Sequence, residues 1–187
     1  MNKVKYAIIV LCAAALLLAA VIGYDYLSAN YDNEVPSENA SSSEAVMAPD
    51  FTVFDGEGNP VSFSDFSGKP VVINFWATWC GYCVKEMPSF ENAFEEFGDE
   101  VVFMMINVTD GYQETKEDAA KFVEEKGYTF PVYFDVKNQA NEIYGVNAIP
   151  TSFFIAPDGA VLGHATGAIT EEGFNEGIRR ILPSETE

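Results

Sequence analysis

Apolar residues along the middle of the chain follow two different spacings, and together they predict a strand followed by a helix. The run from Val71 to Ala77 is continuous, β-branched and aromatic, which is typical of a central strand buried on both faces. Residues 83–97 then carry apolar side chains at helical spacing, with glutamates between them. The first unit of the fold is therefore predicted to be a strand that leads directly into a helix.

The same order recurs further along the chain. A second buried run at 101–106 precedes a helical stretch at about 114–126, which Gly127 should end. This completes a βαβα pattern. The elements predicted after it are a strand at 130–134, a short helix near 139–144, a hairpin of 151–155 and 161–165 about a turn at 156–159, and a closing helix at about 171–182.

The N-terminal part of the chain has the pattern of a membrane segment. Residues 6–24 carry no charge, and these 19 residues approach the roughly 20 needed to cross a bilayer core. Lys3 and Lys5 precede the run and acidic residues follow it, so the positive-inside bias puts the N-terminus in the cytoplasm and the rest outside. A cleaved signal peptide shares these features but ends at a small-residue site, and no good site is present. We predict an uncleaved single-pass anchor at residues 1–24, in the cell membrane.

A change of composition separates this anchor from a globular domain. Residues 25–46 are rich in Ser, Asn, Glu and Ala, with too little large apolar surface to offset the entropy of ordering, and we predict a flexible acidic tether. From Met47 the composition changes, and residues 51–54 and 61–63 flank a short hairpin signal. We predict one catalytic domain at 47–187.

The charge of the chain excludes one class of partner. There are 29 acidic and 10 basic residues, a net charge of −19. Such a chain repels phosphate backbones and lacks the electrostatic attraction that dominates nucleic-acid affinity. Nucleic acid is therefore not expected as a partner.

The pair Cys80 and Cys83 has the spacing of a disulfide, of half a metal site, or of two incidental apolar residues. A structural zinc site needs four ligands, and outside the membrane segment the only other Cys or His is His164, which we interpret as a surface strand residue. We therefore predict no metal site of that kind. Copper transfer stays open, because thiolates are soft ligands.

The position of the pair favours redox chemistry. The cysteines lie where a buried strand turns into a helix, so the first of them faces unpaired N–H groups and the positive helix end, which stabilise a thiolate. Cys80 is then the attacking sulfur, and Cys83, one turn deeper, can resolve a mixed disulfide. We expect this dithiol/disulfide couple to be the redox group, with no bound cofactor.

The segment Asn74–Pro88 resembles the active-site segment of thioredoxin-fold proteins, particularly the membrane-anchored TlpA/ResA-like branch. Residues 149–151 resemble the family's cis-proline loop, and residues 48–51 resemble the N-terminal entry of that branch. The match covers about 47–183, with an extra helix-strand segment at about 112–138 that plain thioredoxins lack. The resemblance implies a thioredoxin-like α/β fold, in which helices flank a central mixed β-sheet that carries an N-terminal β-hairpin.

The resemblance also implies roles for residues outside the cysteine pair. Pro150 is expected to be cis and to pack against the cysteines, with the Ile149 backbone pairing to an extended substrate peptide. Glu86 becomes a candidate proton shuttle for the Cys83 sulfur; the alternative is a first-turn acid that complements the helix dipole. Asn74 stands where plain thioredoxin has a buried aspartate, and an amide cannot titrate, so the proton path stays open.

Two aromatic residues and Ile149 bear on substrate binding and on the direction of electron flow. Trp79 is expected to form substrate-facing surface, and Tyr82 lies in the variable dipeptide that tunes redox poise. This dipeptide matches neither the thioredoxin pattern nor the oxidase pattern, so it does not decide the direction. Ile149 resembles the reductase pattern and favours disulfide reduction.

The function that the resemblance implies is an extracytoplasmic reductase of protein disulfides in cytochrome c maturation, with apocytochrome c and similar cysteine-pair proteins as its substrates. A membrane thiol carrier would supply electrons, because no soluble thiol pool can be assumed there. The alternatives are a disulfide oxidase or isomerase with the same residues, and a membrane-tethered copper-binding or chaperone module. A thiol peroxidase is disfavoured, because Ile73 and Ala77 replace the Pro and Thr/Ser of the peroxidase motif.

Overall fold

The computed structural model describes Leu17 and residues 45–183. Residues 45–183 belong to one compact unit, which begins at Glu44. The predicted anchor at 1–24, apart from Leu17, and the tether as far as residue 44 lie outside the described residues, so both stay predictions. Within the described residues, no helix has the length and apolar character needed to cross a bilayer.

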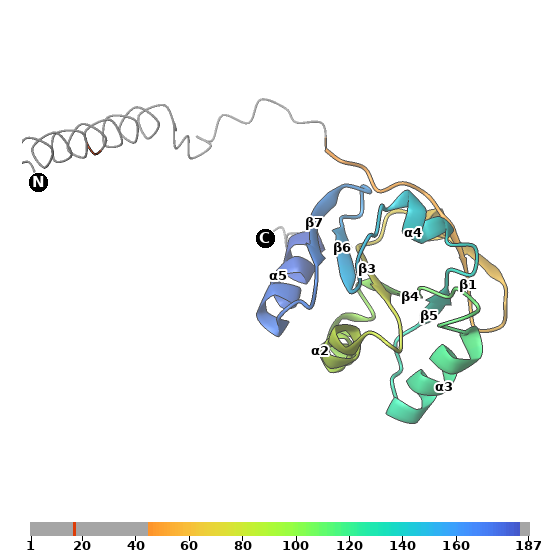
Figure 1. Ribbon diagram of the computed structural model, residues 1–187. Helices are drawn as coiled ribbons and strands as arrows, with labels where there is room; N and C mark the ends of the chain where they lie inside the picture. The colour runs from red at the N-terminus through yellow and green to blue at the C-terminus, as the bar shows by residue number, and fades with distance from the viewer. Residues whose placement is uncertain (1–16, 18–44, 184–187) are drawn as a thin grey trace, which may run out of the picture. The chain divides into compact units, whose positions relative to one another are not determined.

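A seven-stranded mixed sheet forms the centre of the domain, with the strand order β2-β1-β5-β4-β3-β6-β7 (Figure 1). Strands β3, β4 and β5 are parallel, whereas β6 and β7 on one side and β1 and β2 on the other are antiparallel to their neighbours. The strands are β1 Thr52–Phe54, β2 Pro60–Ser62, β3 Val71–Trp76, β4 Val102–Asn107, β5 Val132–Phe134, β6 Thr151–Ile155 and β7 Val161–Thr166. The predicted mixed sheet, with its N-terminal hairpin of β1 and β2, is confirmed.

Helices cover both faces of this sheet, as predicted. Helices α2, α3 and α5 contribute to the apolar core on one face, whereas α4, β1 and the short 3-10 helix η1 contribute to the core on the other. Figure 1 shows α4 lying apart from α2 and α5 across the sheet. The helical elements are η1 Phe63–Phe66, α2 Gly81–Phe97, α3 Lys116–Lys126, α4 Gln139–Ile143 and α5 Glu171–Ile181.

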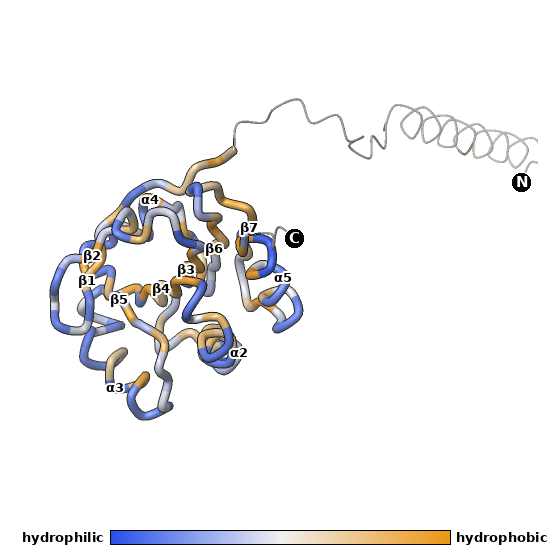
Figure 2. The backbone as a smooth tube through the Cα atoms, turned by 180° about the vertical axis from the view of Figure 1, so that it is seen from behind, coloured by the Kyte–Doolittle hydropathy of each residue, from blue (hydrophilic) through white to orange (hydrophobic). Residues whose placement is uncertain are grey.

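Strand β3 is buried on both faces, as its continuous apolar sequence predicts. Val72 and Trp76 belong to the core under α2, α3 and α5, whereas Val71, Ile73 and Phe75 belong to the opposite core. Alternate residues of a strand point to opposite faces, so both cores hold this strand in place. Figure 2 shows the mostly apolar colouring of the central strands, in contrast to the helices, where hydrophilic and hydrophobic residues are mixed. The loop that follows β3 is thus carried by a rigid support.

Element ends differ from the prediction where side-chain caps decide them. Gly127 ends α3 in the left-handed conformation with φ 73°, as predicted. The helix begins at Lys116 rather than near Glu114, because the Thr115 side chain accepts from the Asp118 N–H and takes the N-cap position. The second arm of the hairpin ends at Ser62, and the unpredicted η1 begins at the next residue, Phe63. Glu114 is consequently free of the helix and points inward.

Candidate active site

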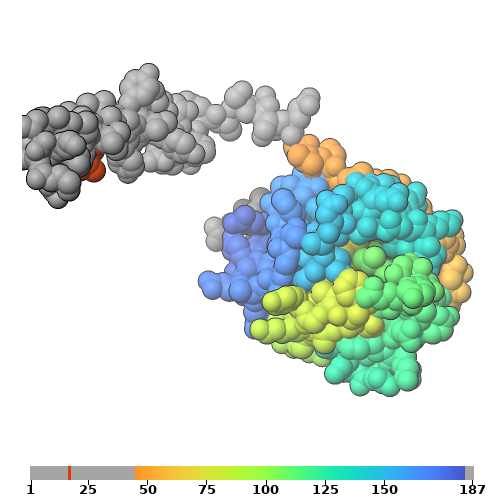
Figure 3. Space-filling model, viewed as in Figure 1, coloured from red at the N-terminus to blue at the C-terminus, as the bar shows by residue number. Residues whose placement is uncertain are grey.

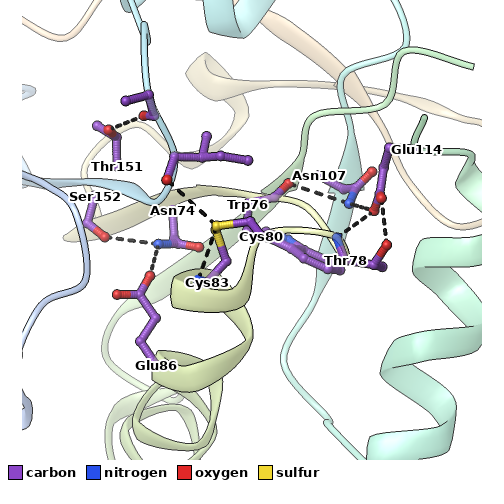
Figure 4. Close-up of a disulfide and its surroundings, with 12 residues drawn as sticks. Asn74, Trp76, Thr78, Cys80, Cys83, Glu86, Asn107, Glu114, Thr151 and Ser152 are labelled. Atoms are coloured by element: carbon purple, nitrogen blue, oxygen red, sulfur yellow. Dashed lines mark hydrogen bonds between the residues drawn. A yellow bond between two sulfur atoms is a disulfide. The ribbon is translucent and has the colours of Figure 1, made fainter. Parts of the chain in front are cut away.

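Cys80 and Cys83 form a disulfide at the N-terminus of α2, with their Cα atoms 5.2 Å apart (Figure 4). Cys80 is the N-cap residue of the helix, and its sulfur accepts a hydrogen bond from the Cys83 N–H at 3.2 Å. Cys80 keeps 6% of its surface exposed and Cys83 none. Of the two sulfurs, only that of Cys80 is therefore open to attack on another molecule.

The helix end favours the ionised form of Cys80. An N-cap side chain faces backbone N–H groups that have no partner within the helix, and these groups carry the positive end of the helix dipole. A thiolate at this position accepts the Cys83 N–H more strongly than a neutral thiol does. The sequence-based expectation that the first cysteine faces free N–H groups agrees with this geometry.

The cis-proline loop lies against the cysteine pair. The Ile149–Pro150 bond is cis, as the resemblance implies, and the Ile149 carbonyl oxygen is 3.6 Å from the Cys80 sulfur. In the disulfide this sulfur has no proton and the approach is a contact; in the dithiol the S–H can donate to the oxygen. The Thr151 hydroxyl donates to the Ala148 carbonyl at 2.8 Å and fixes the loop.

Glu86 is buried on the inner side of α2, within a polar cluster that includes Asn74. Asn74 Nδ2 donates to Glu86 Oε1 and to Ser152 Oγ, each at 3.0 Å, and the Ile169 N–H donates to Glu86 Oε2 at 3.0 Å. Only 5% of Glu86 is exposed. It lies beyond the first turn of α2, so the alternative of a first-turn acid at the helix dipole does not describe its position.

The environment of Glu86 brings its titration into the neutral range. Burial raises the pKa of Glu86 to about 7, and the hydrogen bonds from the Ile169 N–H and Asn74 only partly oppose that rise. Figure 4 shows this carboxyl one turn along α2 from the cysteines, with Asn74 between β3 and the helix. A buried carboxyl that exchanges protons near neutral pH beside a dithiol is suited to proton transfer.

A second polar cluster lies on the other side of the disulfide, around Glu114 (Figure 4). Glu114 is fully buried and accepts from the Thr78 N–H at 2.9 Å, the Thr78 hydroxyl at 2.6 Å and Asn107 Nδ2 at 2.6 Å. The sequence analysis did not single out Glu114, Asn107 or Ser152. Nothing in the sequence distinguishes Glu114 from the acidic residues around it, because its burial depends on where β3 and β4 end.

Two aromatic side chains form the surface beside the active site. Trp79 is 51% exposed and Tyr82 is 70% exposed, so both are accessible to another protein, whereas Ile149 is half-buried. In Figure 3 the yellow-green surface of α2 lies between the blue C-terminal elements and the green surface of the inserted segment. His164 is exposed on β7 and its ring stacks on Phe153 at 5.9 Å, which confirms its interpretation as a surface strand residue.

A groove of about 990 Å³ lies on the other side of the cis-proline loop and includes neither cysteine. Ala148 and Thr151 contribute to its wall, together with β7 and the segment before β1. Among residues 45–183 no group of three or more His, Cys, Asp or Glu side chains is placed to hold a metal ion. Within the site described above, the dithiol supplies redox chemistry and the Glu86 carboxyl is the group suited to proton transfer.

The chain is similar in sequence to proteins of one family. The AhpC/TSA family model matches residues 45–163. Thiol-disulfide oxidoreductase ResA of Bacillus subtilis (strain 168) is 34% identical over 185 residues, which cover 98% of each chain. A protein of the same name from Geobacillus thermodenitrificans (strain NG80-2) is 36% identical over 169 residues, which cover 90% of this chain and 92% of that one.

Solved structures give a consistent picture. A putative thiol:disulfide interchange protein DsbE from Chlorobium tepidum is 31% identical with a TM-score of 0.67, covering 74% of this chain and 97% of its own. StoA from Bacillus subtilis is 28% identical with a TM-score of 0.60, covering 71% of this chain and 98% of its own. The residues matched by the family model, 45–163, include both cysteines, Glu86 and the cis-proline loop.

Proposed function

The chain belongs to the AhpC/TSA family of thioredoxin-fold proteins and is a ResA-like thiol-disulfide oxidoreductase, and from this premise we propose that it reduces protein disulfides, with Cys80 as the attacking sulfur and Cys83 as the resolving sulfur. The observation that carries the proposal is that the two sulfurs differ in accessibility and in hydrogen bonding. Cys80 is the accessible one and accepts the Cys83 N–H at the helix end, whereas Cys83 is fully buried.

The reaction consists of two exchanges. The Cys80 thiolate attacks one sulfur of the substrate disulfide, the other substrate sulfur leaves as a thiolate, and a mixed disulfide forms. The Cys83 thiolate then attacks the Cys80 sulfur and releases the second substrate thiolate. The substrate has gained two electrons, its thiolates take up protons, and the protein is left with the Cys80–Cys83 disulfide. No cofactor besides this couple takes part.

Glu86 takes the proton of Cys83 in this mechanism. A buried thiol is a poor nucleophile until it loses its proton, and removing the proton into a buried site requires a nearby base. With a pKa of about 7, the Glu86 carboxylate can accept this proton and return it when the disulfide is reduced. Asn74 orients the carboxyl by its hydrogen bond and does not itself titrate.

The substrate binds across Trp79, Tyr82, Ile149 and Pro150. Trp79 and Tyr82 are exposed beside Cys80 and supply apolar surface. The backbone of Ile149 approaches the Cys80 sulfur, so an extended peptide paired with it would bring its disulfide to that sulfur. This arrangement supports binding of a cysteine-containing segment in extended form, rather than of a small molecule in a closed pocket.

In the cell, the predicted anchor at residues 1–24 holds this domain at the outer face of the cell membrane. The anchor raises the effective concentration of the domain near a membrane thiol carrier, which re-reduces the Cys80–Cys83 disulfide. The substrate we propose is apocytochrome c, which has a pair of cysteines, and the process in which the protein acts is cytochrome c maturation. The relatives are named only as oxidoreductases and interchange proteins, so the anchor rests on the sequence pattern, and the carrier, substrate and process rest on the family resemblance.

Trapping the mixed disulfide tests the proposal. The full-length Cys83→Ser protein, once reduced, should form a stable adduct with apocytochrome c in which the cysteine pair is oxidised, because nothing resolves the Cys80 bond. The matched Cys80→Ser protein should form no such adduct, since Cys83 is buried. Non-reducing electrophoresis and peptide mass spectrometry identify the linked residues. An adduct through Cys83, or none with any protein disulfide, would overturn the assignment.

A further inference from the structure

Glu114 is a buried carboxylate that the proposed exchange reaction does not use. It is fully buried, and its three hydrogen-bond partners, the Thr78 N–H, the Thr78 hydroxyl and Asn107 Nδ2, all donate to it. The ion pairs among the described residues do not include it. Burying a carboxylate without an opposite charge is costly, and a neutral side chain would join these segments at lower cost. All three partners are donors, so this part of the fold is arranged around the two acceptor oxygens of Glu114.

The two bonds to Thr78 fix the turn that presents Cys80. The Cys80 N–H donates to the Ala77 carbonyl at 3.2 Å, so residues 77–80 form one tight turn between β3 and α2. Thr78 is the second residue of this turn, and Glu114 holds both its backbone N–H and its hydroxyl. The orientation of the turn determines whether Cys80 sits at the N-cap with its sulfur 3.2 Å from the Cys83 nitrogen.

Glu114 is itself held in place by its own segment. Its N–H donates to Asp110 Oδ1 at 2.9 Å, and its carbonyl accepts from the Gly111 N–H at 3.0 Å. Asn107, its third partner, is the last residue of β4, and its amide also approaches the Trp76 carbonyl at the end of β3. The carboxylate thus joins the ends of two central strands to the turn before the cysteines.

We propose that Glu114 is a positioning residue that holds the Ala77–Cys80 turn so that the Cys80 sulfur keeps its N-cap geometry and its thiolate form. The inference deepens the proposed function, because it concerns the sulfur that attacks the substrate. It acts through the hydrogen bonds to Thr78. The negative charge alone would act in the opposite direction, because a nearby anion disfavours a thiolate.

The test follows the alkylation rate of Cys80 across the acid and neutral pH range in the reduced full-length protein. The pH at which the alkylation rate is half its maximum should rise by about one unit in Glu114→Ala. Below this midpoint the variant should therefore be alkylated about 10-fold more slowly than wild type. Glu114→Gln keeps one acceptor oxygen, and its rise should be smaller. Cys83 and Glu86, the other titratable groups of the site, are the same in all three proteins.

Glu91 offers a matched control. Its carboxylate accepts from the N–H and the hydroxyl of Thr129, the same pair of groups that Thr78 offers, but it joins the middle of α2 to the inserted segment. Glu91→Gln should leave the alkylation midpoint of Cys80 unchanged, whatever it costs in stability. A shift in this variant equal to that of Glu114→Gln would overturn the proposal, because loosening α2 anywhere would then suffice.

An unchanged or lowered alkylation midpoint of Cys80 in folded Glu114→Ala would also overturn the proposal. The Glu114 carboxylate would then have only a structural role. If Glu114→Ala does not fold, Glu114→Gln provides the test, and cooperative denaturant unfolding checks that it is folded. A raised alkylation midpoint in Glu114→Gln supports the proposal, and an unchanged one rejects it. The assay needs no protein substrate. A wild-type protein with an acid-shifted Cys80 but no reductase activity would therefore reject the proposed function and leave this inference standing.

Discussion

At the scale of single residues, the site is organised by two buried carboxylates on either side of the disulfide. Glu86 lies with Asn74 on one side and exchanges protons near neutral pH, whereas Glu114 on the other side holds the turn before Cys80. Neither carboxylate forms an ion pair in the described part of the chain, so uncharged donors stabilise them: backbone N–H groups, side-chain amides and, for Glu114, the Thr78 hydroxyl. The two acids contact different groups, so we expect substitution of Glu86 to change proton transfer and substitution of Glu114 to change the reactivity of Cys80.

Replacing Glu86 by glutamine should change the pH dependence of disulfide reduction. The wild-type rate should follow a group with a pKa of about 7, and Glu86→Gln should lose this dependence and fall by about 100-fold, because the base for Cys83 is gone. Single-turnover reduction of a peptide disulfide, followed at several pH values around neutrality, measures both the rate and its pH dependence. Glu96→Gln, which removes an exposed acid of the same helix, is the control and should behave as wild type. A full rate in Glu86→Gln would reject the proton role.

The same carboxyl should make stability depend on pH. The pKa of Glu86 rises from 4.5 to about 7 on folding, so the folded state favours the protonated form. Its contribution is fully present below about pH 4.5 and is lost as the pH rises to about 7, a change of about 1 to 3 kcal/mol. Urea unfolding of wild type and Glu86→Gln at several pH values measures it. The stability of wild type relative to the variant should decrease over this range, and a constant difference would contradict the assigned pKa.

At the scale of elements, the site depends on β3 and α2, which the sequence predicts well because their side chains are buried by simple periodic patterns. The contributions of the loops are harder to predict. The sequence marks Asn74 only as a departure from a family pattern. Its hydrogen bond to Ser152 depends on the antiparallel pairing of β6 with β3, and its hydrogen bond to Glu86 depends on the packing of α2 on β3. Glu114 could not be recognised, because an acidic residue before a helix is ordinarily exposed. Long-range pairing decides both positions.

The packing of α5 on β6 should tolerate no side chain at Gly177. A Cβ added there would overlap the ring of Phe154, which lies in the core beneath α5. Gly177→Ala should therefore lower the free energy of unfolding by about 1 to 3 kcal/mol, although alanine is the better helix former. Gly163→Ala faces the same ring at 3.7 Å, an ordinary contact, and should change stability by less than about 1 kcal/mol. Denaturant unfolding compares them, and equal effects would contradict the packing.

At the scale of the whole molecule, a strongly acidic chain carries an active site whose exposed surface is aromatic. The net charge is −19, while Trp79 and Tyr82 flank the accessible sulfur. This charge leads us to predict no nucleic-acid partner, and it favours protein substrates with basic residues near their disulfide. The domain itself was predictable from the order of its elements, whereas the anchor that would hold it at a membrane lies outside the described residues and stays a prediction.

The charge predicts a salt-dependent preference among substrates. A peptide disulfide flanked by lysines should be reduced about 10-fold faster at low ionic strength than the same peptide flanked by glutamates, because the field of the protein attracts it. Added salt screens this field, so the two rates should converge as its concentration rises. Second-order rate constants at increasing salt measure the effect. A ratio that does not change with salt would show that the net charge does not guide substrates to this site.

The most direct test of the central claim is the reduction potential of the Cys80–Cys83 couple, measured by equilibration with a thiol-disulfide buffer of known ratio. The claim is that this pair reduces protein disulfides, with the Cys80 thiolate stabilised at the end of α2. A potential near the roughly −270 mV of thioredoxin is the predicted result. A value near about −120 mV, typical of a strong disulfide oxidant, would contradict the direction of electron flow proposed for this protein.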